Sequence, residues 1–217
     1  FSGGWSSVKL YFMLGLPTET DEDVLGIADL AQKVYHVWRE NTPNRSRGVR
    51  ITVSTSCFVP KSHTPFQWEA QNTQEEYLRK VTLLREHMRN KSITYNWHDP
   101  ETSYLEAVLS RGDRRIADVI EEAWRHGAKF DSWSEYFNLQ TWLTAMETCG
   151  VSPAFYANRV REKDEILPWH VISDGVKESY LWRERETAYA GKITPDCKVK
   201  CSGCGANKLC KGGICHG

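Results

Sequence analysis

The alternation of apolar and polar positions changes along the chain, and these changes predict its first elements. A nearly continuous apolar run, Val8 to Leu16 (VKLYFMLGL), has the length of a β-strand and is closed by Gly15 and Pro17. Such a run is typical of a strand that is buried on both faces of a sheet. Acidic residues then open a stretch in which apolar positions recur at helical spacing up to Trp38. This pattern predicts an amphipathic helix with negative charge at its positive end.

Strand-like and helix-like stretches continue to alternate. A β-rich run from Val49 to Val59 is followed by a helical stretch from Gln74 to about Asn90 and by a short strand candidate, Ile93 to Trp97. The order strand, helix, strand, helix, strand is the pattern of parallel βαβ units, whose helices cover the sheet. Three strands do not close a barrel, so we expect this segment to need partners that it does not contain.

From about residue 100 onward, the β-branched runs give way to helix formers. We expect helices at residues 103–110, 114–126, 135–148 and 174–188. The sequence therefore predicts three parts, with bounds 1–100, 101–190 and 191–217. Large aromatic side chains at helical spacing are first of all core residues. We therefore expect a buried position for the tryptophans of the helical part, Trp124, Trp133, Trp142, Trp169 and Trp182.

Arg111, Arg114 and Arg115 place three guanidinium groups beside a predicted helix start. Such a group can hold a phosphate or a carboxylate in bidentate fashion. It can equally form an ion-pair network with the acidic residues nearby, and we favour this second interpretation. The acidic candidates are Glu106, Glu121 and Glu122.

Charge and cysteine usage narrow the class of protein. The 28 Lys and Arg residues balance the 28 Asp and Glu residues, so no global field holds the protein on nucleic acid or on an anionic membrane. No apolar run approaches the roughly 20 residues of a membrane helix. The chain begins at Phe1 without a leader, and we interpret it as a fragment of a cytoplasmic protein. In that compartment, clustered cysteines indicate metal before disulfides.

Five of the seven cysteines gather near the end of the chain, at positions 197, 201, 204, 210 and 215. Thiolates two or three residues apart can converge on one ion, and four ligands suffice for zinc or for a [4Fe-4S] cluster. We expect Cys197, Cys201 and Cys204 to form the core, with Cys210 or Cys215 as the fourth ligand. An auxiliary iron-sulfur cluster and a structural zinc site both stay open, and disulfides or free thiols are a further alternative.

The turn Gly15 to Thr20 (GLPTET) follows the first strand candidate. At the carboxyl end of a parallel strand, a Gly-Pro turn lets the backbone approach a ligand, and the following helix start offers free N–H groups. The alternative is a strand-to-helix turn with ordinary capping.

Several stretches resemble one enzyme superfamily. KLYFMLGLPTETDEDV (residues 9–24) resembles the strand-and-turn element of radical S-adenosylmethionine (SAM) barrels, in which methylthiotransferases and the Elongator catalytic subunit carry a related Gly-(Phe/Leu)-Pro-Gly-Glu-Thr. Residues 51–68 resemble the next barrel strand with its Thr-Pro exit. Residues 105–115, 167–176 and 194–205 resemble the uncharacterised radical SAM proteins that carry an N-terminal cobalamin-binding-like domain.

The resemblance implies an α/β fold: the C-terminal half of a radical SAM (β/α) barrel, then an α-helical extension and a small Cys-rich metal-binding tail. It further implies a [4Fe-4S] cluster that cleaves SAM to a 5′-deoxyadenosyl radical, fed by a reductant such as flavodoxin or ferredoxin, with cobalamin as an open further cofactor. The Cys-x3-Cys-x2-Cys loop for that cluster is expected before Phe1, so the fragment alone is expected to be inactive. The substrate stays unidentified.

By the same resemblance, residues at the ends of two neighbouring strands border the methionine, ribose or adenine of SAM: Gly15, Pro17, Thr18 and Glu19, and then Phe58 and Val59. The alternative for Phe58 and Val59 is plain packing at the strand end. A competing function is a zinc-stabilised binding module, with RNA as a conceivable partner, on a catalytically inactive scaffold. The balanced charge argues against it.

Overall fold

The structure, a computed structural model, describes all residues except 43–45, 47 and 207–217. The chain folds as two compact units. The first contains residues 1–58 and 72–104, and the second contains residues 59–71 and the chain from Leu105 onward. Helix α3 (Pro100–Arg111) contributes residues 100–104 to the first unit and its remainder to the second.

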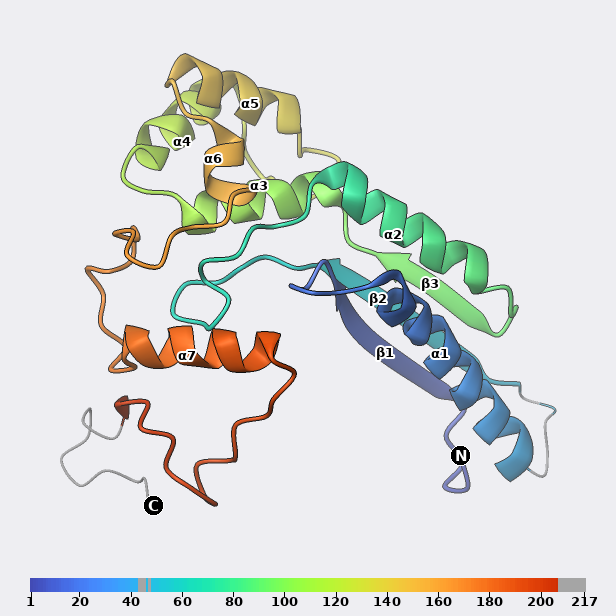
Figure 1. The fold of residues 1–217 in the computed structure, drawn as a ribbon. Helices are drawn as coiled ribbons and strands as arrows, with labels where there is room; N and C mark the ends of the chain where they lie inside the picture. Colours follow the sequence, from blue (N-terminus) through green and yellow to red (C-terminus); the bar gives the residue numbers. More distant parts are fainter. Residues whose placement is uncertain (43–45, 47, 207–217) are drawn as a thin grey trace. The chain divides into compact units, whose positions relative to one another are not determined.

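The first unit is built on three parallel strands in the order β1-β2-β3. The strands are β1 (Ser7–Leu14), β2 (Arg50–Cys57) and β3 (Ile93–Trp97). Helices α1 (Asp21–Asn41) and α2 (Gln74–His87) connect them, as Figure 1 shows. The predicted succession of strand, helix, strand, helix and strand is thereby confirmed.

Local hydrogen bonds explain where the two helices begin. The Thr20 hydroxyl accepts the backbone N–H of Asp23 at 3.2 Å, and the Asp23 carboxylate accepts the backbone N–H of Thr20 at 2.9 Å. This reciprocal pair is a capping box, and it satisfies donors that the first helical turn leaves unpaired. The Thr73 hydroxyl caps α2 by accepting the N–H of Glu76 at 3.2 Å.

One face of the sheet packs against α1 and α2. Leu14, Ile51 and Val53 are fully buried there. Their neighbours in this core include Ala31 of α1 and Leu84 of α2, which are also fully buried. Burial of this apolar surface is the main force that holds the sheet to its helices.

The opposite face of the sheet is open, which contradicts the expectation that the first strand is buried on both faces. Tyr11 and Met13 of β1 are 72% and 48% exposed. Side chains along a strand alternate between faces, so Lys9, Tyr11 and Met13 all point away from the two helices. Among the described residues of this unit, no helix lies over that face.

The predicted partial radical SAM barrel is not formed. The sheet has three strands and stays open, so the fold class is α/β with an open parallel sheet and seven helices among the described residues. The physical reason is strand number, because a parallel barrel closes with about eight tilted strands. The α-helical character expected after residue 100 is observed.

The second unit contains the remainder of α3 and four further helices. They are α4 (Ile116–Arg125), α5 (Leu139–Thr148), α6 (Pro153–Ala157) and α7 (Glu178–Tyr189). Helix α4 packs against α5. The inserted segment 59–71 belongs to this unit, because Trp68 packs in a core cluster with Leu167, Trp169 and Leu181.

Arg111 joins three segments of this unit, which neither of its predicted roles anticipated. Its side chain is fully buried and donates to the backbone carbonyls of Tyr156 (2.9 Å), Pro60 (3.3 Å) and Gln67 (3.4 Å). Burial, followed by repulsion from Arg161, lowers its pKa to about 10. Arg111 therefore neither faces a ligand nor joins an ion-pair network. Its guanidinium instead holds the backbone of segment 59–71 and of α6 in place through hydrogen bonds.

The tryptophans of the helical part divide into two groups. Trp142 and Trp169 are buried, as expected, and Trp182 is partly buried. Trp124 and Trp133 are 66% and 55% exposed, so the core prediction is wrong for these two. Helical spacing alone does not distinguish a core tryptophan from a surface one.

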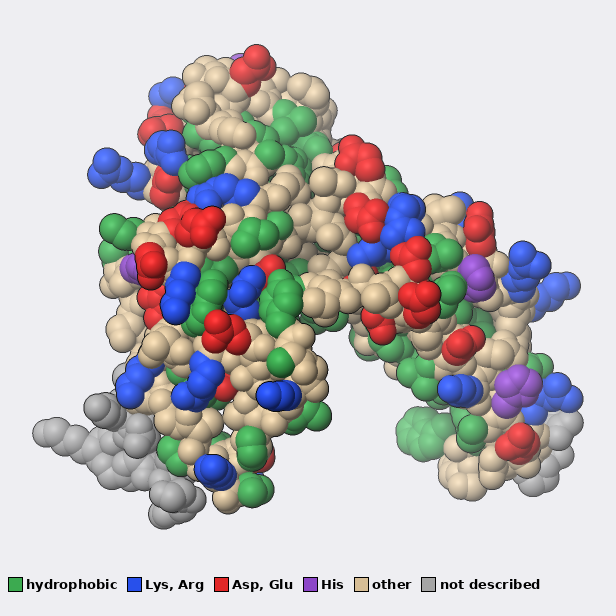
Figure 2. All heavy atoms as spheres, viewed as in Figure 1, with side chains coloured by type: hydrophobic (Ala, Val, Ile, Leu, Met, Phe, Trp, Pro, Cys, Tyr) green, Lys and Arg blue, Asp and Glu red, His purple; other side chains and the backbone are tan. Residues whose placement is uncertain are grey.

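Two features of the surface bear on possible partners. Among the described residues, no helix is both long enough and apolar enough to cross a membrane. On the face shown in Figure 2, Lys and Arg side chains are interspersed with Asp and Glu side chains. This mixture agrees with the balanced charge of the sequence.

Candidate functional site at the carboxyl ends of the strands

The open face of the sheet carries an ordered row of polar side chains. In the strand register, Tyr11 lies beside Ser54, and Ser54 lies beside Asn96. One step nearer the carboxyl ends, Met13 lies beside Ser56. Side chains in register on neighbouring strands point to the same face. Hydroxyl, amide, thioether and phenol groups are thus brought together from three strands.

This row borders a hollow of about 480 Å³. It is lined by residues of all three strands and by the residue after β3, namely Tyr11, Phe12, Met13, Ser54, Thr55, Ser56, Asn96, Trp97 and His98. The hollow lies wholly within the first unit. Its size and its mixture of apolar walls with a few polar groups are those of small-molecule sites.

Hydrogen bonds between side chains and to backbone hold the strands that form the floor of this hollow. The Thr55 hydroxyl, on the helix side of the sheet, pairs with the Tyr95 hydroxyl at 2.8 Å. The Tyr77 hydroxyl donates to the carbonyl of His98 at 3.3 Å. Burial raises the pKa of Tyr77 well above its usual range, so this phenol stays protonated and keeps its donor. The end of β3 is therefore tied to α2.

Beside the hollow, the turn after β1 has a backbone that only glycine adopts easily. Gly15 has a φ of +93°, and a Cβ at this position would lie 2.7 Å from Oδ1 of Asn72. Thr18, three residues on, also has a positive φ of 67°. Non-glycine residues in this region carry strain, which is concentrated at ligand-binding and active sites.

Glu19 fixes the shape of this turn from inside. Its two carboxylate oxygens accept the backbone N–H of Gly15 at 2.9 and 3.0 Å. Its Oε1 also accepts from Nζ of Lys80 at 2.7 Å, and both side chains are more than nine-tenths buried. Lys80 donates further to Oδ1 of Asn72 at 3.2 Å. The Glu19 carboxylate is thus occupied within the protein.

Pro17 and Thr18 line a second hollow, of about 350 Å³, on the helix side of the turn. Its other lining residues are Phe12, Met13, Leu16, Glu19, Asp23 and Ile27. Phe12 and Met13 border both hollows. Hydrogen bonds from the backbone N–H and the hydroxyl of Thr20 lower the pKa of Asp23, so this carboxyl group is charged at neutral pH.

Of the residues predicted to bind a cofactor, Gly15, Pro17, Thr18 and Glu19 lie together at the end of β1. Phe58 follows β2, and its N–H donates to the carbonyl of Leu14 at 2.9 Å, which extends the pairing of the two strands. Phe58 and Val59 are each 7% exposed and line neither hollow. Val59 begins the second unit. Whether any of these residues contacts a cofactor stays a prediction.

The structure shows no assembled metal site in the cysteine tail. Cys197 and Cys201 are exposed, Cys204 is partly buried, and none of the three forms a disulfide. No group of three or more potential ligands lies close enough to hold a metal within the part of the chain that is described. Cys210 and Cys215 lie outside the described residues. The predicted Cys-rich metal-binding tail is therefore not found within residues 191–206, where the three described thiols form no metal-binding group.

Sequence reasoning missed the polar row and the partner of Glu19. The row has a signal, because open positions of β2 and β3 alternate with buried or apolar ones. In β2, Thr52, Ser54 and Ser56 alternate with Ile51, Val53 and Cys57, with Thr55 as the one polar residue on the buried side, and in β3 Thr94 and Asn96 alternate with Ile93, Tyr95 and Trp97. That period of two indicates one buried and one open face. Lys80 has no such signal, because it lies 61 residues from Glu19 in the sequence.

Comparison with known proteins gives a distant similarity. The chain is 27% identical over 118 residues to the uncharacterised protein MJ0966 of Methanocaldococcus jannaschii. The match covers 54% of this chain and 24% of that protein, so the chain spans about a quarter of the length of the relative. No protein-family model and no solved structure matches the chain.

Proposed function

We propose that this chain is part of a radical SAM enzyme and that the open face of its sheet binds the nucleoside of SAM. The observation that carries the proposal is the polar hollow at the carboxyl ends of three parallel strands, directly beside the Gly15 turn. In open α/β sheets, ligands bind at the carboxyl ends of the strands. The likeness of residues 9–24 and 51–68 to radical SAM elements supplies the identity of the ligand.

The lining of the hollow fits a nucleoside. Ser54, Ser56 and Asn96 offer hydroxyl and amide groups that can exchange hydrogen bonds with ribose hydroxyls and with the edge of a base. Tyr11 and Met13 offer an aromatic ring and a thioether, which pack on a planar base. The volume of about 480 Å³ lies inside the range of small-molecule sites.

The second hollow fits the amino-acid part of the same molecule. Asp23 carries a full negative charge there and can pair with an ammonium group. Phe12 and Met13 border both hollows, so one extended ligand can occupy the two. In this arrangement Gly15, Pro17 and Thr18 lie between the two ends of SAM, while the Glu19 pair with Lys80 keeps the turn rigid.

In the proposed enzyme, a reduced [4Fe-4S] cluster supplies the electron that cleaves SAM, and this chain binds and orients the SAM molecule. No described residue of this chain is assigned as a ligand of that cluster. The residues of this chain exclude water from one side of the nucleoside and fix the strand ends against which it lies. The reductant is of the flavodoxin or ferredoxin class, cobalamin is an open further cofactor, and the substrate is not identified.

The cysteine tail is proposed to hold a second metal group, either an auxiliary iron-sulfur cluster or zinc. Cys197, Cys201 and Cys204 are reduced thiols, and two of them are exposed, so they are available to a metal. Thiolates at such short spacing suit zinc and iron-sulfur clusters alike. Binding would order the tail, because metal sites of this kind form together with the local fold.

The test uses full-length protein purified without oxygen. We expect iron and sulfide in the purified protein and, after addition of dithionite and SAM, release of 5′-deoxyadenosine detected by mass spectrometry. A reaction without dithionite is the control. Absence of both iron and 5′-deoxyadenosine would overturn the proposal, and one zinc per chain without iron would favour the zinc-stabilised binding module instead.

A further inference from the structure

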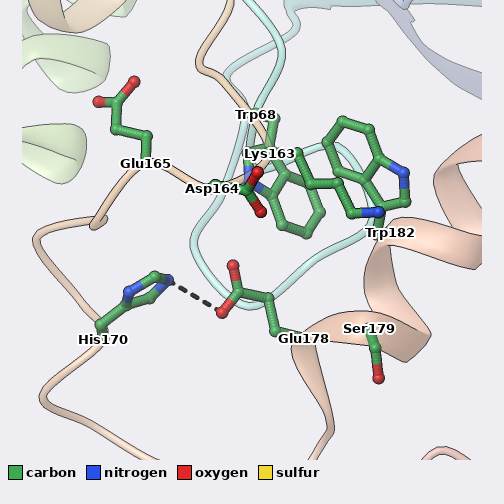
Figure 3. Close-up of a pocket in the computed structure, with 8 residues that line it drawn as sticks. All are labelled: Trp68, Lys163, Asp164, Glu165, His170, Glu178, Ser179 and Trp182. Atoms are coloured by element: carbon green, nitrogen blue, oxygen red, sulfur yellow. Dashed lines mark ion pairs between the residues drawn. The ribbon is translucent and has the colours of Figure 1, made fainter.

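A third hollow, of about 350 Å³, lies in the second unit. Its walls come from segment 59–71, from the loop after α6 and from the start of α7. Figure 3 shows the eight lining residues, Trp68, Lys163, Asp164, Glu165, His170, Glu178, Ser179 and Trp182. None of them belongs to the proposed SAM site, so any ligand here is a separate one.

Three of the lining side chains are already engaged. Glu165 accepts from the guanidinium of Arg159 at 2.7 Å, and in Figure 3 it points away from the other lining residues. His170 lies 3.1 Å from the carboxylate of Glu178 through its Nε2. The other ring nitrogen, Nδ1, accepts the N–H of Leu167 at 3.4 Å. This pair of contacts places the imidazole proton on Nε2, where it is donated to Glu178.

One cationic and one anionic side chain of the lining remain available to a ligand. Lys163 and Asp164 form no ion pair within the described residues, and both are exposed to the hollow. The ammonium of Lys163 lies 5.3 Å from the ring centre of Trp182, which holds it at the hollow without neutralising it. One carboxylate oxygen of Glu178 contacts His170, and the other can accept a hydrogen bond from a ligand.

A buried donor adds to this set. Trp68 is fully buried, and its indole N–H has no acceptor within the described residues. A buried donor without a partner costs about 1–3 kcal/mol, so a ligand that supplies an acceptor is favoured. The start of α7 has no side-chain cap, and the positive end of its dipole adds to the preference for an anionic group.

The hollow therefore presents an anion-binding set and a cation-binding set side by side. Lys163 and the Trp68 N–H suit a carboxylate, whereas Asp164 and Glu178 suit an ammonium group. A residue within a peptide carries neither backbone charge, and a chain terminus carries only one of them. A free α-amino acid carries both on one carbon atom.

We propose that this hollow binds a free α-amino acid. Its carboxylate accepts from Lys163 and from the indole N–H of Trp68, and its ammonium group donates to Asp164 and Glu178. An apolar side chain contacts the exposed part of the Trp182 indole, beside the ammonium of Lys163 and the guanidinium of Arg185 that lie over the same ring. The inference does not depend on the proposed radical SAM activity.

The test measures binding of three matched probes to the 217-residue chain by titration calorimetry and saturation-transfer NMR. The probes are L-phenylalanine, phenethylamine, which lacks the carboxylate, and 3-phenylpropionate, which lacks the ammonium group. We expect L-phenylalanine to bind and each analogue to bind at least about tenfold more weakly, because each loses a charge-assisted hydrogen bond. L-leucine tests whether a different apolar side chain is accepted.

Variants locate the binding site. Lys163→Met and Asp164→Asn should each weaken L-phenylalanine binding about tenfold or more. Both residues are exposed, so the fold tolerates the changes. Lys61→Met, at a lysine of the same unit that does not line the hollow, is the matched control and should leave binding unchanged.

Three results would each overturn the proposal. They are absence of binding for both amino acids, equal binding of phenethylamine and L-phenylalanine, and binding that survives both Lys163→Met and Asp164→Asn. Circular dichroism of every variant establishes that it is folded.

Discussion

Glu19 and Lys80 form a buried ion pair, with Oε1 and Nζ 2.7 Å apart and both side chains more than nine-tenths buried. The same carboxylate accepts the backbone N–H of Gly15 through both oxygens. The pair therefore connects the second turn of α2 to the turn after β1, which lines the second hollow of the proposed SAM site. Its removal should disturb the fold and the site together.

Replacement of Lys80 by Met should be strongly destabilising. It leaves the Glu19 carboxylate buried without its cation, and breaking a buried pair from one side costs about 3–5 kcal/mol. Urea denaturation monitored by circular dichroism measures this loss as a lower midpoint. The double variant Glu19→Gln, Lys80→Met should lose less than the sum of the two single losses, because the two residues are coupled.

The neighbouring residue supplies the control. Arg79 lies next to Lys80 on α2 and pairs with Asp21 at 2.7 Å, but about half of each side chain is exposed. Exposed pairs contribute little to stability. Arg79→Met should therefore leave the midpoint nearly unchanged, and equal losses for Lys80→Met and Arg79→Met would contradict the role given to burial.

Gly15→Ala should destabilise the turn after β1. The φ of +93° is unfavourable for any side chain, and the new Cβ would meet Oδ1 of Asn72 at 2.7 Å. We expect a loss of about 2 kcal/mol in the free energy of unfolding. Gly26→Ala is the matched control. It lies inside α1 with no atom within 4 Å of the new Cβ, and it should stabilise the protein by about 0.5–1 kcal/mol.

These two glycines show what a sequence can and cannot reveal. The order of strands and helices follows from the period of apolar positions, so β1, α1, β2, α2 and β3 are predictable. The need for glycine at position 15 is suggested by the Gly-Pro turn. Its close neighbour Asn72 and the partner of Glu19 are set by tertiary packing, which no local pattern encodes.

The errors have a common physical cause. The apolar run of β1 includes Tyr11 and Met13, and their hydrophobicity led to a prediction of burial on both faces. Arg111 is predicted to hold an anion or to join an ion-pair network, yet carbonyl groups of segment 59–71 and of α6 solvate it inside the second unit. In both cases the hydrophobicity or charge of a side chain predicts only a preference for the interior or the surface. The residues that pack around it in the folded protein determine whether it is buried.

Stability should depend on pH through Glu165. A hydrogen bond from Arg159 lowers the pKa of this carboxyl group, so the folded protein binds its proton less readily than the unfolded chain does. The contribution is present above the unfolded pKa of about 4.3 and is lost as the pH falls through the lower pKa of the folded state. Glu165→Gln should lower stability by about 1 kcal/mol at pH 7.

The free energy of unfolding, measured at pH 7 and at pH 3, tests whether the stabilisation by Glu165 is lost as the pH falls. The difference between the wild-type chain and Glu165→Gln should shrink at the lower pH. With Arg159→Met as background, the same substitution should show a much smaller pH dependence. A difference that grows as the pH falls would show that the pair does not act as described.

Ser54→Leu should separate SAM binding from folding. Ser54 lies at the centre of the polar row, between Tyr11 and Asn96, on the face that no described helix of the first unit covers. A leucine there fills part of the hollow and removes a hydroxyl without entering the core. We expect the dissociation constant for SAM to rise about tenfold or more, the effect of roughly 1.4 kcal/mol.

Thr52→Leu is the matched control. It changes the same face of the same strand but lies outside the lining of the hollow, so SAM binding should be retained. Equilibrium dialysis with labelled SAM measures both variants against the wild-type protein. Equal binding by all three would place the nucleoside elsewhere, because a side chain that fills the hollow cannot leave its occupant undisturbed.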